Sequence, residues 1–130
     1  MFPVKKIMSK NVTKLPADKP VSGVVVSMQT SHCGSVVIAE GDEYVGIITE
    51  RDLVLKVMGM GKDIEKTLNR EIMSSPVMTI DEEAGIIEAN DLMDLHQIRH
   101  LVVVNKKGEM VGVVSVRDLL HPVYLGDTTW

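Results

Sequence analysis

The sequence contains an internal duplication that spans almost the whole chain. The triplet Ile-Met-Ser at 7–9 returns at 72–74, and the segment 46–53 returns at 112–119 with the pattern Gly-aliphatic-aliphatic-(Thr/Ser)-x-Arg-Asp-Leu. Between these two matches the second copy gains one residue, near the turn at 106–108. A duplication of this length predicts two similar units related by a pseudo-twofold axis. It also predicts that a binding site in one copy has a twin in the other.

Composition narrows the partners that such a chain can take. Its 130 residues suit one compact domain, because repeats of about 60 residues are each marginal alone. The formal net charge of −4 argues against binding to a nucleic-acid backbone, and an aromatic content of 3% leaves few rings on which bases could stack. Cys33 is the only cysteine, which excludes an intramolecular disulfide and a multi-thiolate zinc site.

The chain carries no apolar run of membrane-spanning length and no secretory signal pattern. Its longest aliphatic stretch, at 101–104, is far too short to cross a bilayer, and no apolar segment follows the lysines near the N-terminus. We therefore expect a cytoplasmic protein without a membrane segment.

Each copy is predicted to fold as strand, helix, strand, strand, helix. The chain is then an α+β protein with tandem β-α-β-β-α repeats, at 1–60 and 61–130, whose sheets pack face to face and whose linker lies at about 58–68. The expected elements of the first copy are a strand at 11–15, a helix after Pro20 with Asp18 as N-cap, a hairpin at 35–48 and a helix from Thr49 or Glu50.

The expected elements of the second copy follow the same order. They are an extended piece at 77–80, a helix capped by Asp81 or Glu83 and running to about His96, a hairpin at 101–114 and a helix from Ser115. The tail from His121 shows no periodicity, so we expect it to be loosely ordered or packed on a partner.

Apolar spacing predicts the inner faces of these helices. Residues expected in the core are Val21, Val24, Met28, Ile86, Ala89 and Met93, and the inner side of the helix after Thr49 is expected to carry Leu53, Val54 and Val57. One core cannot cover every aliphatic residue of the helices after Thr49 and Ser115, so we also expect a homodimer. The residues expected to form its interface are Leu53, Val54, Val57, Leu119 and Leu120.

The repeated (Thr/Ser)-x-Arg-Asp segment combines a hydroxyl residue at a strand-to-helix junction with an aspartate in the first helical turn. Backbone N–H groups at such a junction attract an anion, and the carboxylate can accept two hydrogen bonds from a ribose diol. The alternative is a capping box, in which the two side chains satisfy backbone N–H groups of the helix. Arg51 and Arg117 favour a bound anion, because cations beside a helix N-terminus are otherwise unfavourable.

The element order, the Ile-Met-Ser openings, the segment at 98–104 and the motif that ends both halves resemble a pair of CBS (cystathionine β-synthase) domains, a Bateman module. The resemblance covers residues 4 to about 121. It implies a regulatory module without enzyme activity that binds AMP, ADP, ATP or S-adenosylmethionine in clefts between the repeats. It further implies that the motif aspartates hold the ribose, that the preceding hydroxyl residues contact phosphate, and that Arg99 and His100 clamp it. The candidate ligand-binding residues are Gly34, Ser35, Thr49, Arg51, Asp52, Arg99, His100, Ser115, Arg117 and Asp118.

The two candidate sites are not equivalent. Where the second copy has Arg99 and His100, the first has the uncharged pair at 34–35, and Glu50 replaces Val116. We therefore expect Asp118 to be the stronger ribose acceptor.

Two other functions compete with ligand sensing. The chain can be a dimerisation module with empty clefts, or a nucleic-acid-associated regulator. No catalytic or metal-binding residues are predicted, because the histidines have no metal-ligand spacing and no phosphate-binding glycine motif is present. The sequence does not identify the effector protein that the module would regulate.

Overall fold

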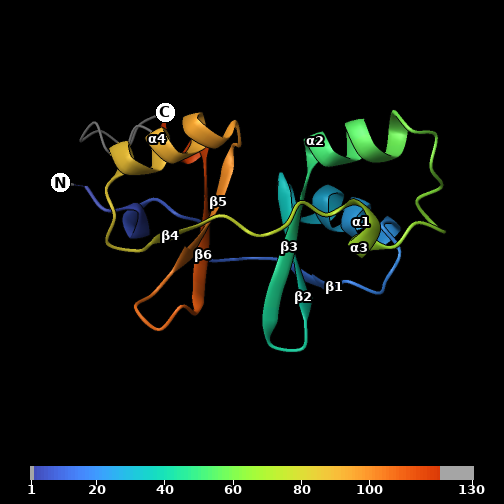
Figure 1. The fold of residues 1–130 in the computed structure, drawn as a ribbon, viewed down its shortest axis with the longest axis horizontal. Helices are drawn as coiled ribbons and strands as arrows, with labels where there is room; N and C mark the ends of the chain where they lie inside the picture. Colours follow the sequence, from blue (N-terminus) through green and yellow to red (C-terminus); the bar gives the residue numbers. More distant parts are fainter. Residues whose placement is uncertain (1, 121–130) are drawn as a thin grey trace. The chain divides into compact units, whose positions relative to one another are not determined.

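The computed structural model describes residues 2–120, which form two compact units (Figure 1). We call the continuous segment Val12–Val77 the central unit. The other, the split unit, combines the N-terminal residues up to Asn11 with the chain from Met78 onward. The tail from His121, for which loose order or contact with a partner is expected, lies outside the described residues.

The central unit is a three-stranded sheet with its helices packed against it. Its elements in chain order are β1 (Lys14–Pro16), α1 (Ser22–Ser31), β2 (Ser35–Glu40), β3 (Glu43–Thr49), α2 (Glu50–Asp52), the π-helix η2 (Leu53–Met58) and α3 (Asn69–Ile72). The middle strand β2 pairs in parallel with β1 and antiparallel with β3.

The split unit repeats this topology. Its elements are the short helix η1 (Val4–Lys6), β4 (Thr79–Asp81), α4 (Ile86–His96), β5 (His100–Val104), β6 (Met110–Ser115) and α5 (Val116–Leu119). Here β5 pairs in parallel with β4 and antiparallel with β6, and the register irregularity in β2 at Ile38/Ala39 returns in β5 at Val103/Val104. The predicted α+β fold with tandem β-α-β-β-α repeats is confirmed.

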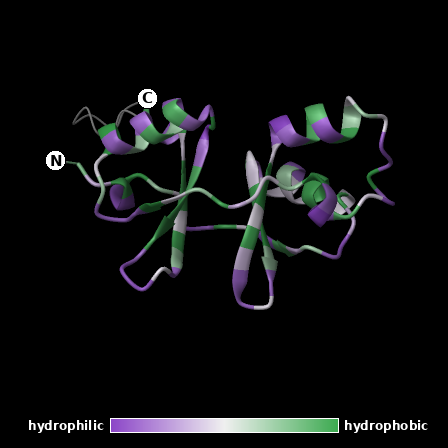
Figure 2. Cartoon of the chain, viewed as in Figure 1, coloured by the Kyte–Doolittle hydropathy of each residue, from purple (hydrophilic) through white to green (hydrophobic). Residues whose placement is uncertain are grey.

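Each unit has its own hydrophobic core, and apolar colouring appears on both its strands and its helices (Figure 2). The core of the central unit includes Val21, Val24, Val36, Ile38, Ile48, Val57 and Ile72. That of the split unit includes Val4, Ala89, Met93, Leu101, Val103, Val114 and Leu119. The remaining predicted core residues, Met28 and Ile86, are partly buried against these cores.

The repeats exchange their opening segments. The N-terminal arm, residues 2–9, belongs to the split unit, where Ser9 and Val113 exchange two backbone hydrogen bonds of 2.8 and 3.0 Å. The central arm, residues 64–74, belongs to the central unit, where Ile47 and Ser74 exchange bonds of 3.1 and 2.9 Å. Each repeat thus supplies the arm that the sheet of the other repeat binds.

An ion pair also ties the N-terminal arm to the split unit. The Lys5 ammonium group lies 2.7 Å from the Glu83 carboxylate in the turn before α4. The hydrogen bond and the charge of Glu83 raise the pKa of Lys5 above its ordinary value. Both groups are exposed to solvent, so this pair is expected to contribute little to stability.

The duplicated glycines of the sequence motif make room for these arms. A Cβ atom on Gly46 would lie 2.5 Å from the sulfur of Met73 in the central arm. A Cβ atom on Gly112 would lie 2.6 Å from the sulfur of Met8 and 2.7 Å from the backbone oxygen of Ser9. A glycine at each position permits this approach without displacing the arm or its methionine, which accounts for the duplication of the glycine together with the Ile-Met-Ser triplet.

The predicted N-caps of the two long helices are wrong. No side chain caps α1 or α4, and the residues at the cap positions are Val21 and Gly85 in place of Asp18 and of Asp81 or Glu83. The arms supply the missing acceptors, because carbonyl groups of the central arm accept from the N–H groups of Val21 and Ser22 at 2.8 and 2.9 Å. In the split unit, the carbonyl of Phe2 accepts from the N–H of Ile86.

The helix after Thr49 also differs from the prediction. Its C-terminal part is a π-helix, in which the N–H of Gly59 donates to the carbonyl of Val54, five residues earlier, at 2.7 Å. This wider turn leaves Val57 buried and Val54 52% exposed, so the prediction that Val54 faces inward is wrong. Leu119 and Val57 are core residues and cannot belong to the expected dimer surface.

Candidate functional site

The end of β3 and the end of β6 bring together the residues predicted for each site. In the central unit, Ser35 lies opposite Thr49 in the strand register, and the carbonyl of Gly34 accepts a hydrogen bond from the N–H of Glu50 at 3.2 Å. In the split unit, His100 lies opposite Ser115, and the carbonyl of Arg99 accepts from the N–H of Val116 at 3.0 Å. The two groups of residues occupy equivalent places in their units.

Both motif aspartates form the capping box that the sequence offered as an alternative. In the central unit, the N–H of Thr49 donates to Asp52 Oδ2 at 2.9 Å, and the N–H of Asp52 donates to Thr49 Oγ1 at 3.2 Å. In the split unit, the equivalent distances between Ser115 and Asp118 are 2.8 and 3.3 Å. Each box uses only Oδ2 of its aspartate, so capping does not by itself prevent the other oxygen from binding a ligand.

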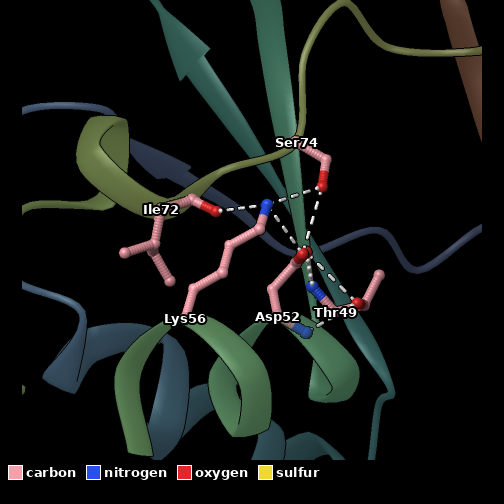
Figure 3. A network of polar contacts seen from close by, with 5 residues as sticks. All are labelled: Thr49, Asp52, Lys56, Ile72 and Ser74. Carbon is pink, nitrogen blue, oxygen red and sulfur yellow. Dashed lines mark hydrogen bonds and ion pairs between the residues drawn. The ribbon is translucent and has the colours of Figure 1, made fainter. Parts of the chain in front are cut away.

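The other oxygen of Asp52 is engaged by two further side chains (Figure 3). The hydroxyl of Ser74 donates to Asp52 Oδ1 at 3.1 Å, and the ammonium group of Lys56 lies 3.1 Å from the same oxygen. Lys56 also donates to Ser74 Oγ at 3.2 Å and to the backbone carbonyl of Ile72 at 3.1 Å. The Asp52 side chain is 9% exposed, so this network largely shields the carboxylate from solvent.

The corresponding oxygen of Asp118 has no such partners among the described residues. No residue within the described range 2–120 donates a hydrogen bond to Asp118 Oδ1, and the residue is only partly buried. Ser9, which corresponds to Ser74, is exposed. In the repeat alignment, Lys56 corresponds to Pro122, which has no ammonium group and lies outside the described residues.

The arginines of both motifs are exposed. Arg99 and Arg117 in the split unit, and Arg51 in the central unit, form no ion pair with a carboxylate of residues 2–120. At the ends of the paired strands, the split unit therefore presents the guanidinium groups of Arg99 and Arg117 to an anion, whereas the central unit presents that of Arg51, next to the acidic Glu50.

Sequence reasoning located the motif residues but missed Lys56 and Ser74. Sequence patterns could have identified both residues. Ser74 belongs to the duplicated Ile-Met-Ser triplet, and Lys56 stands four residues after Asp52, a spacing that allows an ion pair on one face of a helix. Within residues 2–120, no group of three or more histidine, cysteine, aspartate or glutamate residues could hold a metal ion. No helix in that part of the chain is long and apolar enough to cross a membrane.

Comparison with known families settles the membership of the chain. The CBS domain model matches it twice, at residues 4–59 and 70–124, which together make up most of its length. This chain is a pair of CBS domains. CBS pairs are a family of regulatory modules, and its fold accordingly matches solved CBS structures.

Similar proteins of the family come from archaea, bacteria and a plant. The CBS pair is 42% identical over 111 residues to an uncharacterized protein of Methanopyrus kandleri, in a match that covers 85% of the pair and 56% of that protein. The chain thus spans about half the length of the first curated relatives that it matches.

Two solved structures are especially informative. A putative signal-transduction protein with CBS domains from Burkholderia ambifaria superposes with a TM-score of 0.89 at 25% identity, covering 98% of the CBS pair and 97% of that chain. A CBS domain protein from Pyrobaculum aerophilum complexed with AMP gives a TM-score of 0.80 at 28% identity, covering 90% and 89% of the two chains.

Proposed function

We propose that this CBS pair is a regulatory module that binds an adenosine ligand beside Asp118. The observation that carries the proposal is Asp118 Oδ1, which no residue of the described range 2–120 engages, in the same unit as Arg99 and Arg117, which pair with no carboxylate of that range. The AMP complex of the Pyrobaculum aerophilum protein supports the ligand class. The proposed ligand is AMP, ADP, ATP or S-adenosylmethionine. The repeats at 1–60 and 61–130 each contain one motif aspartate, Asp52 in the first and Asp118 in the second.

The residues of the split unit divide the recognition of a nucleotide between them. Asp118 Oδ1 is available to accept hydrogen bonds from the ribose hydroxyls, while Oδ2 stays in the capping box. Arg99 and Arg117 supply positive charge for the phosphates, with Ser115 and His100 at the adjoining strand ends. Hydrogen bonds to a charged group contribute about 1.5–3 kcal/mol each, so two to the ribose would dominate the affinity.

The test is a comparison of two aspartate variants by calorimetric titration with AMP, ATP and S-adenosylmethionine. Asp118→Ala is expected to cost roughly 2–4 kcal/mol of binding, about 30-fold or more in affinity. Asp52→Ala is expected to cost less, because both oxygens of Asp52 already have partners inside the protein. Equal losses would contradict the asymmetry, and no binding by the wild-type chain would reject the proposal.

A structural module with empty clefts is the second candidate, and the capping boxes favour it because they give both aspartates a role without a ligand. Ligand at about 100 times its dissociation constant stabilises a protein by about 2.7 kcal/mol. A rise in melting temperature with an adenosine ligand therefore supports sensing, and an unchanged melting temperature supports the structural role.

We further propose that the pair acts without catalysis, as a cytoplasmic homodimer that regulates a separate effector. Apolar side chains on η2 support self-association, since Val54, Leu55 and Met58 are each at least half exposed. The single, half-buried Cys33 is compatible with a reducing compartment. Sedimentation of the full chain at tens of micromolar tests the dimer, and a monomer at that concentration would reject it.

A further inference from the structure

We infer that the Lys56 side chain blocks the Asp52 site by binding the carboxylate in place of a ligand. It thereby limits the CBS pair to one adenosine ligand per chain. The inference rests on the proposed function, because it concerns which of the two motif aspartates can receive a ribose. It goes further by assigning the difference in ligand binding between the Asp52 and Asp118 sites to Lys56, a residue outside the motif.

The hydrogen-bonding capacity of Asp52 is already filled. A carboxylate offers about four acceptor positions, two on each oxygen. Asp52 Oδ2 accepts from the N–H and the hydroxyl of Thr49, at 2.9 and 3.2 Å. Asp52 Oδ1 accepts from Ser74 and Lys56, both at 3.1 Å. A ribose hydroxyl can therefore bind to Asp52 only by displacing a partner from inside the protein.

Lys56 is equally committed. An ammonium group has three N–H donors. Those of Lys56 face three oxygens, from Asp52, Ser74 and the carbonyl of Ile72 (Figure 3). Two of these acceptors lie on the central arm, so the lysine joins the helix end of the site to the arm that crosses it. A ligand that displaced Lys56 would break all of these contacts together.

As far as residue 120, the second copy shows no equivalent network around its aspartate. Asp118 uses Oδ2 for Ser115 in the same way, but no residue within 2–120 engages its Oδ1. The sequence has proline at 122, where an equivalent lysine would stand. The difference between the two sites is thus a difference in internal occupancy as well as in the surrounding charge.

Equilibrium dialysis with AMP, and with adenosine as an uncharged probe of the same ribose, tests the inference on the full chain. The wild type is expected to bind one equivalent, Asp118→Ala none, and Lys56→Met two. The double variant Lys56→Met, Asp118→Ala is expected to regain one equivalent, with an affinity at least about tenfold above the weakest binding that the same dialysis would detect for the Asp118→Ala chain. Lys5→Met is the matched control, because it breaks an ion pair on the other arm without touching either aspartate, and it should bind one equivalent.

The outcomes separate this inference from the proposed function. One equivalent for both the wild type and Lys56→Met leaves the proposed function standing and overturns the role of Lys56. Two equivalents for the wild type overturn it as well. No binding by the wild type rejects the proposed function at Asp118, yet one equivalent for Lys56→Met would still uphold the inference, and none would reject both. If Lys56→Met does not fold, the aspartate variants decide. An equivalent that the Asp118→Ala chain still binds, and that the added Asp52→Ala substitution abolishes, would show that Lys56 does not block the Asp52 site.

Discussion

The two motif glycines are expected to differ in their tolerance of alanine, although they occupy equivalent positions. At Gly46 the three atoms nearest to the added methyl group are all side-chain atoms of Met73, at 2.5, 2.7 and 3.0 Å. A methionine side chain has several rotatable bonds and can move aside. Overpacking costs about 1–3 kcal/mol, and Gly46→Ala is expected at the lower end, about 1 kcal/mol.

Gly112→Ala is expected to cost more, about 3 kcal/mol, at the upper end of the same range. Its methyl group would lie 2.7 Å from the backbone oxygen of Ser9, and a backbone atom cannot rotate away. Relief requires the arm to retreat, which stretches the two hydrogen bonds between Ser9 and Val113. Each such bond contributes about 1 kcal/mol.

Urea unfolding of the full chain measures both free energies, and amide hydrogen exchange at Ser9 and Ser74 reports each arm separately. Combining Gly46→Ala with Met73→Ala should recover most of the cost of the glycine substitution, whereas Met8→Ala should recover little of the cost of Gly112→Ala. The reasoning is refuted if Gly46→Ala is as costly as Gly112→Ala, or if truncation of Met8 rescues its partner fully.

Three further outcomes follow from the described contacts. Asp52→Ala should lower the free energy of unfolding by about 1–3 kcal/mol and Asp118→Ala by about 1 kcal/mol in urea titrations, because among the described residues Asp52 joins a partly exposed ion pair as well as a cap, whereas Asp118 joins a cap alone; the reverse order would contradict the occupancy of the Asp52 site. His32→Gly should stabilise the chain by about 0.5–1 kcal/mol, since His32 ends α1 at a φ of 52° that favours glycine, and a lower melting temperature would count against this. Met58→Glu should convert the proposed dimer to a monomer in sedimentation, because Met58 is 75% exposed on η2, and an unchanged dimer would place the interface elsewhere.

The sequence predicts the elements of this fold because their signals are local. Short uninterrupted apolar runs identified β2 and β5, and the (Thr/Ser)-x-Arg-Asp segment identified the starts of α2 and α5 and offered their capping boxes as one of two alternatives. Each of these features depends on residues that are only a few positions apart in the sequence. The local pattern is therefore enough to predict where the strand or helix lies.

The exchange of the arms could not be predicted in this way. The helix α1 lacks a side-chain cap because carbonyl groups of the central arm, more than forty residues later, accept its N–H bonds. Likewise, the spacing of apolar residues in a regular α-helix predicted that Val54 faces the core. No pattern in the sequence indicated the π-helix, in which Val54 is exposed. The Lys56 network escaped prediction because it joins η2 to the arm across sixteen and eighteen residues.

The crossing arms also bear on the order in which the chain can fold. In the central unit, the arm contact joins Ile47 to Ser74 within one continuous segment, whereas in the split unit it joins Ser9 to Val113, with the whole central unit between them. Contacts that close a longer loop cost more chain entropy and form more slowly. The central unit can therefore close first, during or soon after synthesis of its own segment. The split unit must wait for the last strand, and loss of residues 2–9 would leave it open while the central unit kept every arm contact it needs.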